Sequence, residues 1–184
     1  MKHYTIIILF FILILQGCDI PSIDQTKISN KDFFDLKLFF NNEAEYLKSK
    51  NIRIKKIIKH NNTIEENIQQ IDDWENELKI FSDCDINKPS CKNRYTVDST
   101  LSNSGFMTLH YEANDEKMQT KVIDIQISEN NVHSIMIINK ETNNIFESQQ
   151  YLTYIPGKRY TIDKIQSVTL FEKENYSIDV QFIE

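Results

Sequence analysis

The feature that most constrains this chain is the alternation of apolar and polar residues over its C-terminal half. Alternation with a period of two places successive side chains on opposite faces of a strand. The polar stretch Glu129–Asn131 between two such segments is typical of a hairpin turn. Short strands joined by short turns favour an antiparallel meander, and we expect about six strands. The segments that carry the pattern are 94–98, 106–111, 121–128, 132–139, 145–154, 160–171 and 176–183.

Two helices are predicted ahead of this sheet, one on each side of a short strand. Residues 33–50 have apolar side chains at spacings of three and four, which indicates an amphipathic helix. That face consists of Phe33, Leu36, Phe40, Ala44 and Leu47, and Phe39 and Tyr46 widen it. The next segment, 52–59, alternates and then slips, as a strand with a bulge does.

The second predicted helix covers residues 63–82. Thr63 and Glu66 have the spacing of a capping box. An apolar stripe follows at Ile64, Ile68, Ile71, Trp74, Leu78 and Phe81. The opposite face is acidic, as a solvated helix face is, and a basic protein partner there is the less favoured alternative.

Together these patterns predict an α+β fold: two N-terminal helices flanking a short strand, then an antiparallel β-meander with a helix packed on one face. The expected domains are a signal peptide at 1–17, a lipidated cysteine with a flexible tether at 18–31, and one globular domain at 32–184. The formal net charge is −6. An acidic balance argues against nucleic acid or anionic lipid as the main partner.

The boundary after residue 17 is predicted from the N-terminal sequence. Lys2 precedes an apolar run, Thr5–Leu15, that is shorter than the ~20 residues of a spanning helix. The run ends at Leu15-Gln16-Gly17-Cys18. These four residues resemble the lipobox of bacterial lipoproteins, and the general layout resembles the small lipoproteins of unknown function of Bacteroidota. The resemblance implies cleavage before Cys18, acylation of its thiol, and a place on a membrane of the cell envelope, on its periplasmic or surface face. The alternatives are an ordinary secretory signal and an uncleaved anchor.

With Cys18 assigned to lipid, Cys84 and Cys91 remain as an even pair. An exported protein meets oxidising conditions, so we expect a disulfide between them, with two buried free thiols as the alternative. The segment 83–87 begins like a calcium loop, but Lys88 and Arg94 replace the glycine and the closing glutamate of that loop.

No metal, cofactor or catalytic motif is predicted. His60, His110 and His133 lie in different predicted elements without ligand-type spacing. A glycine-rich phosphate loop and a Gly-x-Ser-x-Gly elbow are both absent from the sequence.

Two further features concern the surface. Asp98-Ser99-Thr100 resembles the acceptor motif for O-glycosylation of exported Bacteroidota proteins, with Ser99 as the acceptor. Aromatic residues gather late in the chain near Pro156-Gly157; exposed together they would bind a protein or a sugar ring, and buried they are sheet core. They are Tyr151, Tyr154, Tyr160 and Phe171.

These patterns lead to three functional hypotheses. The first is a membrane-anchored, non-catalytic interaction or adaptor protein with a protein partner in the envelope. The second is a carrier of an apolar ligand in a cavity between sheet and helix. The third is an enzyme whose acidic or histidine side chains converge only on folding.

Overall fold

The computed structural model describes residues 33–183. The predicted signal peptide (1–17), the tether (18–31) and the lipidation site Cys18 lie outside these residues. The helical elements are α2 (Leu36–Ser49), α3 (Trp74–Glu77), α4 (Lys79–Ser82) and the 3₁₀ turn η1 (Pro89–Cys91). The strands are β1 (Arg53–His60), β2 (Thr63–Gln70), β3 (Tyr95–Leu101), β4 (Met107–Ala113), β5 (Thr120–Ser128), β6 (Asn131–Thr142), β7 (Phe146–Ile155), β8 (Arg159–Val168) and β9 (Glu174–Ile183).

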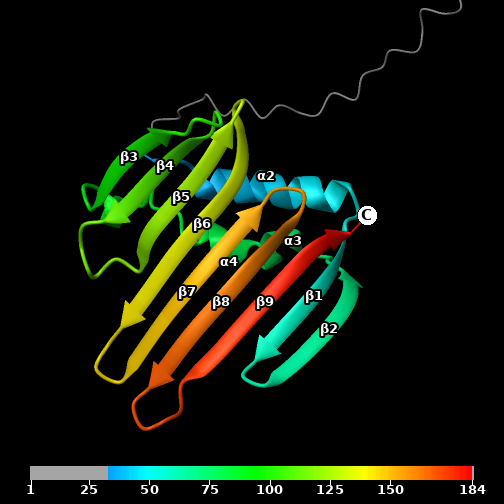
Figure 1. Cartoon of the computed structure of the whole chain (residues 1–184), viewed down its shortest axis with the longest axis vertical. Helices are drawn as coiled ribbons and strands as arrows, with labels where there is room; N and C mark the ends of the chain where they lie inside the picture. The colour runs from blue at the N-terminus through cyan, green and yellow to red at the C-terminus, as the bar shows by residue number, and fades with distance from the viewer. Residues whose placement is uncertain (1–32, 184) are drawn as a thin grey trace, which may run out of the picture.

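All nine strands form one open antiparallel sheet in the order β2-β1-β9-β8-β7-β6-β5-β4-β3. Strands β3 to β9 follow one another as a meander, and the β1–β2 hairpin is added where β1 pairs with β9. The helices lie together on one side of the sheet (Figure 1). The other side of the sheet is covered by no described element, and we call it the open face.

Helix α2 is amphipathic as predicted. It begins after Asp35, whose carboxylate accepts a hydrogen bond from the Leu38 amide at 3.0 Å and so satisfies a free helix N–H. Tyr46 is 41% exposed, so it does not widen the buried face. The buried positions are Leu36, Phe39, Phe40, Glu43, Ala44 and Leu47.

The core lies between α2, the short helices α3 and α4, and the helix-facing side of the sheet. The rings of Phe40 and Phe81 stack with their centroids 5.1 Å apart, and Tyr154 from β7 meets Phe40 edge-on at 5.1 Å. Aromatic contacts of this kind add to the free energy gained by burying their area. The sheet supplies fully buried aliphatic side chains to the same core, among them Ile123, Ile125, Ile135, Ile137, Leu152 and Val180.

The prediction of a second helix over 63–82 is wrong in its first half. Thr63–Gln70 is strand β2, paired with β1 from His60↔Thr63 to Arg53↔Gln70, so Thr63 and Glu66 form no capping box. Ile64 and Ile68 are 65% and 50% exposed. A spacing of four residues is compatible with one face of a helix and with one face of a strand, which explains the error. Only the second half is helical, as the single turns α3 and α4, which bury Trp74, Leu78 and Phe81.

The predicted α+β class and antiparallel meander are confirmed, while the number of strands was underestimated. All seven C-terminal segments are strands, and the β1–β2 hairpin raises the total to nine. The pairing of β1 with its neighbours is regular and shows no bulge. The predicted hairpin turn is confirmed between Ser128 and Asn131, with positive φ at Glu129 and Asn130.

Candidate partner-binding surface

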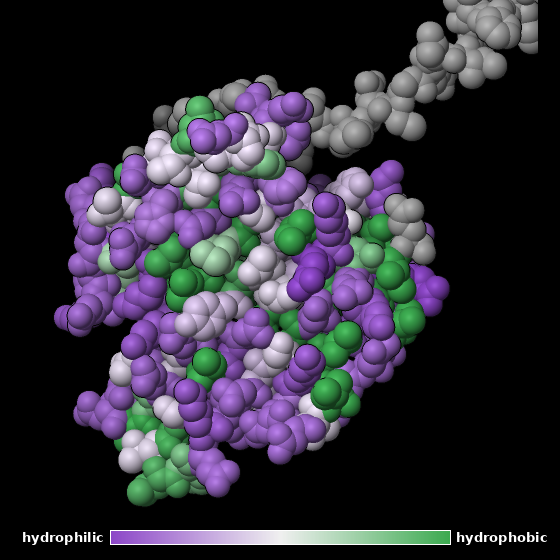
Figure 2. All heavy atoms as spheres, in the orientation of Figure 1, coloured by the Kyte–Doolittle hydropathy of each residue, from purple (hydrophilic) through white to green (hydrophobic). Residues whose placement is uncertain are grey.

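The open face is built by the alternation of side chains along the central strands. On β5, β6 and β7, every second residue is buried beneath the helices, such as Ile123, Ile137 and Leu152. The residues between them therefore point to the open face. Figure 2 shows this face as mainly hydrophilic, with separate apolar groups.

The register aligns apolar side chains across three strands of this face. Val122 on β5 lies opposite Ile138 on β6, and Ile138 lies opposite Tyr151 on β7. Directly opposed side chains in antiparallel strands are in contact distance. Met136 stands two residues before Ile138 and hence on the same side. We call Val122, Met136, Ile138 and Tyr151 the open-face patch; Met136 and Tyr151 are 38% and 37% exposed.

A histidine–carboxylate pair borders the open-face patch. His110 Nδ1 lies 2.6 Å from Asp124 Oδ1, and Asp124 is opposite Met136 in the register. Glu112 Oε2 is 3.8 Å from His110 Nε2. The hydrogen bond to Asp124 and the two negative charges raise the pKa of His110 despite some desolvation. The pair can therefore offer a partner a charged hydrogen-bonding group beside apolar side chains.

A second set of polar contacts is buried and holds the helices onto the sheet. Tyr154 donates to Glu43 of α2, O–H to Oε2, at 2.6 Å. Burial raises the pKa of Glu43, and the hydrogen bond from Tyr154 partly opposes that rise. On the next strand Tyr160 donates to Glu77 of α3, which also pairs with Lys56 of β1 at 2.9 Å. Burial raises the pKa of Tyr160 as well, and its bond to Glu77 adds to that rise. Tyr154 and Glu43 are buried, while the Lys56 and Glu77 side chains are 20% and 21% exposed, and both sets of contacts join a helix to the sheet.

The four aromatic residues proposed from the sequence do not form one exposed patch. Tyr154 and Tyr160 are 0% and 1% exposed, in the core. Tyr151 is on the open face, and Phe171 is in the β8–β9 connection, 77% exposed. Alternation already separates Tyr151 from Tyr154, because an odd spacing in a strand reverses the face. Val122, Met136 and Ile138 were missed, because their meeting depends on the strand register.

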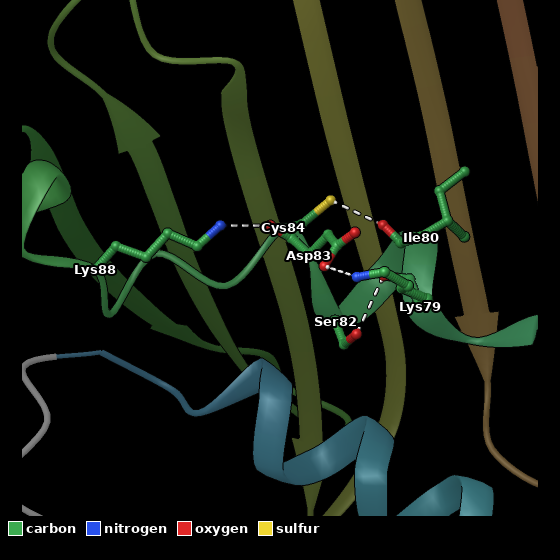
Figure 3. A network of polar contacts seen from close by, with 6 residues as sticks. All are labelled: Lys79, Ile80, Ser82, Asp83, Cys84 and Lys88. Carbon is green, nitrogen blue, oxygen red and sulfur yellow. Dashed lines mark hydrogen bonds and ion pairs between the residues drawn. The ribbon is translucent and has the colours of Figure 1, made fainter. Parts of the chain in front are cut away.

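The two cysteines of the described chain are buried free thiols. Cys84 Sγ lies 3.2 Å from the Ile80 carbonyl oxygen and accepts a bond from the Asn139 amide at 3.2 Å. Figure 3 shows this sulfur directed at Ile80, beside the contacts of Lys79 and Lys88 with Asp83. Burial raises the pKa of Cys84, which makes it a poor nucleophile. The Cys84–Cys91 disulfide stays a prediction.

The other candidates are dispersed. Ser99 is exposed on the edge strand β3, and its amide bonds to Asp98 Oδ1 at 2.7 Å; its glycosylation stays a prediction. His60 of β1 stacks on Tyr176 at 4.2 Å, and His133 of β6 lies against Phe106 at 4.9 Å. Within residues 33–183, no three His, Cys, Asp or Glu side chains are placed to hold a metal ion.

One cavity of about 290 Å³ lies between α2 and the segment that leads into α3. Its walls are mainly polar and carry four carboxylates against one lysine. This lining does not suit an apolar ligand. The polar side chains are Asn41, Glu45, Lys48, Asp72, Asp73 and Glu75.

Comparisons with protein-family models, curated proteins and solved structures give no match for this chain. Among the described helices, none is long and apolar enough to span a membrane.

Proposed function

We propose that this chain is a lipid-anchored protein of the bacterial cell envelope that binds a protein partner through the open face of its sheet, without catalysis. The observation that carries the proposal is the open-face patch. Tyrosine and methionine are enriched in the centres of protein interfaces, where tyrosine combines apolar area with a hydroxyl donor. Charged groups at the rim, here His110 and Asp124, add orientation and specificity.

The anchor supports the same proposal from the other end of the chain. Cys18 comes three residues after the apolar run ends and stands fifteen residues before Phe33. A tether of this length would keep the domain close to the membrane while leaving it free to turn toward a neighbour. High local concentration lets an interface of modest size function.

The alternative of an apolar-ligand carrier needs a cavity between helix and sheet. In the described structure that interface is filled by aromatic rings: Phe81 meets Phe40 at 5.1 Å, Tyr160 at 5.7 Å and Tyr154 at 5.8 Å. The alternative of an enzyme would need catalytic groups that converge in a cleft. The polar cavity beside α2 is lined by carboxylates and one lysine, with no histidine or cysteine among its described residues, and the His110 side chain lies on the open face, 39% exposed.

Site-specific photocrosslinking in cells of the native host tests the proposal. A photoreactive amino acid at position 151 should give one dominant protein adduct. The matched control is Leu38, which is 54% exposed on α2, on the helix side of the molecule. Met136 is 38% exposed, and replacing it with lysine should abolish the adduct from position 151 while the far-UV circular dichroism spectrum stays unchanged. Equal adducts from both positions, or none from position 151, would contradict a partner at the open face.

A further inference from the structure

Three of the most exposed large apolar side chains lie together at one end of the sheet. Ile145 precedes β7 and is 65% exposed, while Leu170 and Phe171, in the β8–β9 connection, are 97% and 77% exposed. Figure 2 shows an apolar group at the bottom of the view, where Figure 1 places the ends of β7 and β8. We call Ile145, Leu170 and Phe171 the apolar tip.

Hydrogen bonds join the two connections that form the apolar tip. The Thr169 amide donates to the Ile145 carbonyl at 2.9 Å, next to the last β7–β8 pair, Phe146↔Val168. The Ile145 amide donates to Asn143 Oδ1 at 3.0 Å, and the Phe171 amide donates to the Val168 carbonyl at 3.0 Å. The three side chains are therefore presented by a backbone of defined shape.

Leu170 has an unfavourable backbone conformation as well as an exposed side chain. Its φ is 74°, in the left-handed region that glycine and asparagine adopt most readily. With 97% of its surface exposed, the leucine gains nothing from the core in return. A residue that costs stability in the free domain is expected where it serves binding.

The charge near the apolar tip limits what it can bind. The neighbouring strand ends and the β8–β9 connection carry Lys140, Glu141, Glu147, Glu172, Lys173 and Glu174, an excess of acidic groups. Lys140 is already paired with Glu147 at 3.1 Å. Anionic lipid headgroups attract basic clusters, so this rim favours an uncharged or zwitterionic surface.

We propose that the apolar tip inserts into the interfacial region of a bilayer of zwitterionic lipid, and so gives the anchored domain a fixed orientation. The insertion depends on the proposed anchor for its strength, because a few exposed side chains bind a membrane weakly on their own. The fifteen residues from Cys18 to Phe33 can span about 50 Å. A ten-residue strand such as β7 is only about 33 Å long. The tether is therefore long enough for either end of the sheet to reach the membrane that holds the anchor. The apolar tip would meet that membrane at high effective concentration.

The test uses the mature acylated protein, reconstituted in vesicles of pure phosphatidylcholine. Trp74 is the single native tryptophan and is buried, so it gives a constant background. A tryptophan introduced by Phe171→Trp should shift its emission to shorter wavelength and be quenched by lipids brominated on their acyl chains. The matched control is Leu101→Trp, because Leu101 is 76% exposed at the other end of the sheet, beside the β3–β4 connection. The tryptophan introduced at position 101 should remain unquenched.

Two further variants separate this proposal from the anchor. The mature chain, residues 18–184 with Cys18→Ser and therefore without lipid, should bind the same vesicles weakly. Leu170→Ser in this chain should reduce the partition at least about tenfold, because the burial of one leucine side chain is lost. Quenching of the tryptophan at position 171 without the lipid on Cys18 would leave the apolar tip supported even if the anchor failed.

Three outcomes would overturn insertion of the apolar tip. The first is an absence of quenching at position 171 in the acylated protein, or equal quenching of the tryptophan at position 101. The second is binding that appears only when phosphatidylserine is added, which would indicate charge attraction. The third is protection of the tryptophan at position 171 only in native membranes with their proteins, which would indicate a protein site.

Discussion

Glu43 is a carboxyl group that the fold buries and then satisfies with a single strong contact. It is 8% exposed on the inner side of α2, and the Tyr154 hydroxyl is 2.6 Å away. A buried carboxylate is costly unless it is hydrogen-bonded, because the charged form loses its hydration. Glu43 thus links α2 to β7 and at the same time makes the stability of the domain depend on pH.

That dependence has a definite sign. The folded-state pKa of Glu43 lies above 4.5, so the folded protein holds this proton more tightly than the unfolded chain. The stabilisation from the proton is complete below pH 4.5 and is lost as pH rises through the folded-state pKa. Urea denaturation from roughly pH 4 to roughly pH 8 should show the native protein losing stability relative to Glu43→Gln as pH rises.

The Tyr154→Phe variant is the control for this pH effect. Removing the hydroxyl raises the pKa of Glu43 further and leaves a buried group unsatisfied, at a cost of about 1–3 kcal/mol near neutral pH. The loss should be smaller in acid, where Glu43 is protonated. A difference between native protein and Glu43→Gln that stays constant with pH would contradict this role.

His110 on the open face should titrate above its ordinary pKa of 6.5 because it bonds to Asp124. Its contribution to stability is present below pH 6.5 and is lost as pH rises through the raised pKa. An NMR titration of the imidazole should show the pKa fall in Asp124→Asn. The fall should be smaller in Glu112→Gln, since Glu112 contributes less. Equal falls, or none, would mean that the pair is not formed in solution.

At the scale of elements, the fold was predictable wherever the spacing of apolar residues suited only a strand or only a helix. Strands β3 to β9 follow from alternation alone, and α2 follows from apolar side chains at spacings of three and four. The segment 63–82 was not predicted correctly, because the spacing of Ile64 and Ile68 suits a helix as well as a strand. In addition, Asn61-Asn62 was not identified from the sequence as the turn that links β1 to β2. The open-face patch and the His110–Asp124 pair were not predicted, because they depend on strand register. Register is set by turn geometry and by bulges, such as those between β5 and β6, which alternation alone does not reveal.

The boundary at residue 70 can be tested by truncating side chains on either side of it. Phe81→Ala should destabilise the domain by about 3–5 kcal/mol, because Phe81 is fully buried among aromatic rings. Ile68→Ala should cost less than about 1 kcal/mol, since Ile68 is half exposed on β2. If urea denaturation showed equal losses in the free energy of unfolding, the result would support the continuous helix predicted over 63–82 and contradict strand β2.

A substitution in the β5–β6 turn is expected to stabilise the domain, unlike the truncations above. Glu129 has a φ of 51° and Asn130 a φ of 62°, which are the positive values of a type I′ turn. A glutamate in the left-handed region costs roughly 1–2 kcal/mol. Glu129→Gly should therefore raise the free energy of unfolding by about 1 kcal/mol. The control, Glu147→Gly in β7, should lower it, because glycine weakens a strand interior; stabilisation by both would contradict the turn assignment.

At the scale of the whole molecule, the proposals combine into one arrangement at a membrane. The helices fill one side of the sheet, so the other side remains for a partner. The proposed lipid on Cys18 would hold the domain to the bilayer, and insertion of the apolar tip would fix which way the open face is directed. The three proposals (the lipid anchor, the partner at the open face and the insertion of the apolar tip) can be tested separately. The proposed anchor is what would bring the other two to a membrane surface.

Intact mass spectrometry of the protein purified from its native membrane tests that anchor most directly. The account predicts a chain that begins at Cys18 and carries the added mass of an acylated glyceryl group. The same spectrum, with and without reductant and alkylation, would settle the Cys84–Cys91 disulfide and reveal any glycan. An unmodified chain that begins elsewhere would contradict the lipid anchor and indicate a secreted domain, and an unmodified chain that keeps residues 1–17 would contradict it in favour of an uncleaved N-terminal anchor.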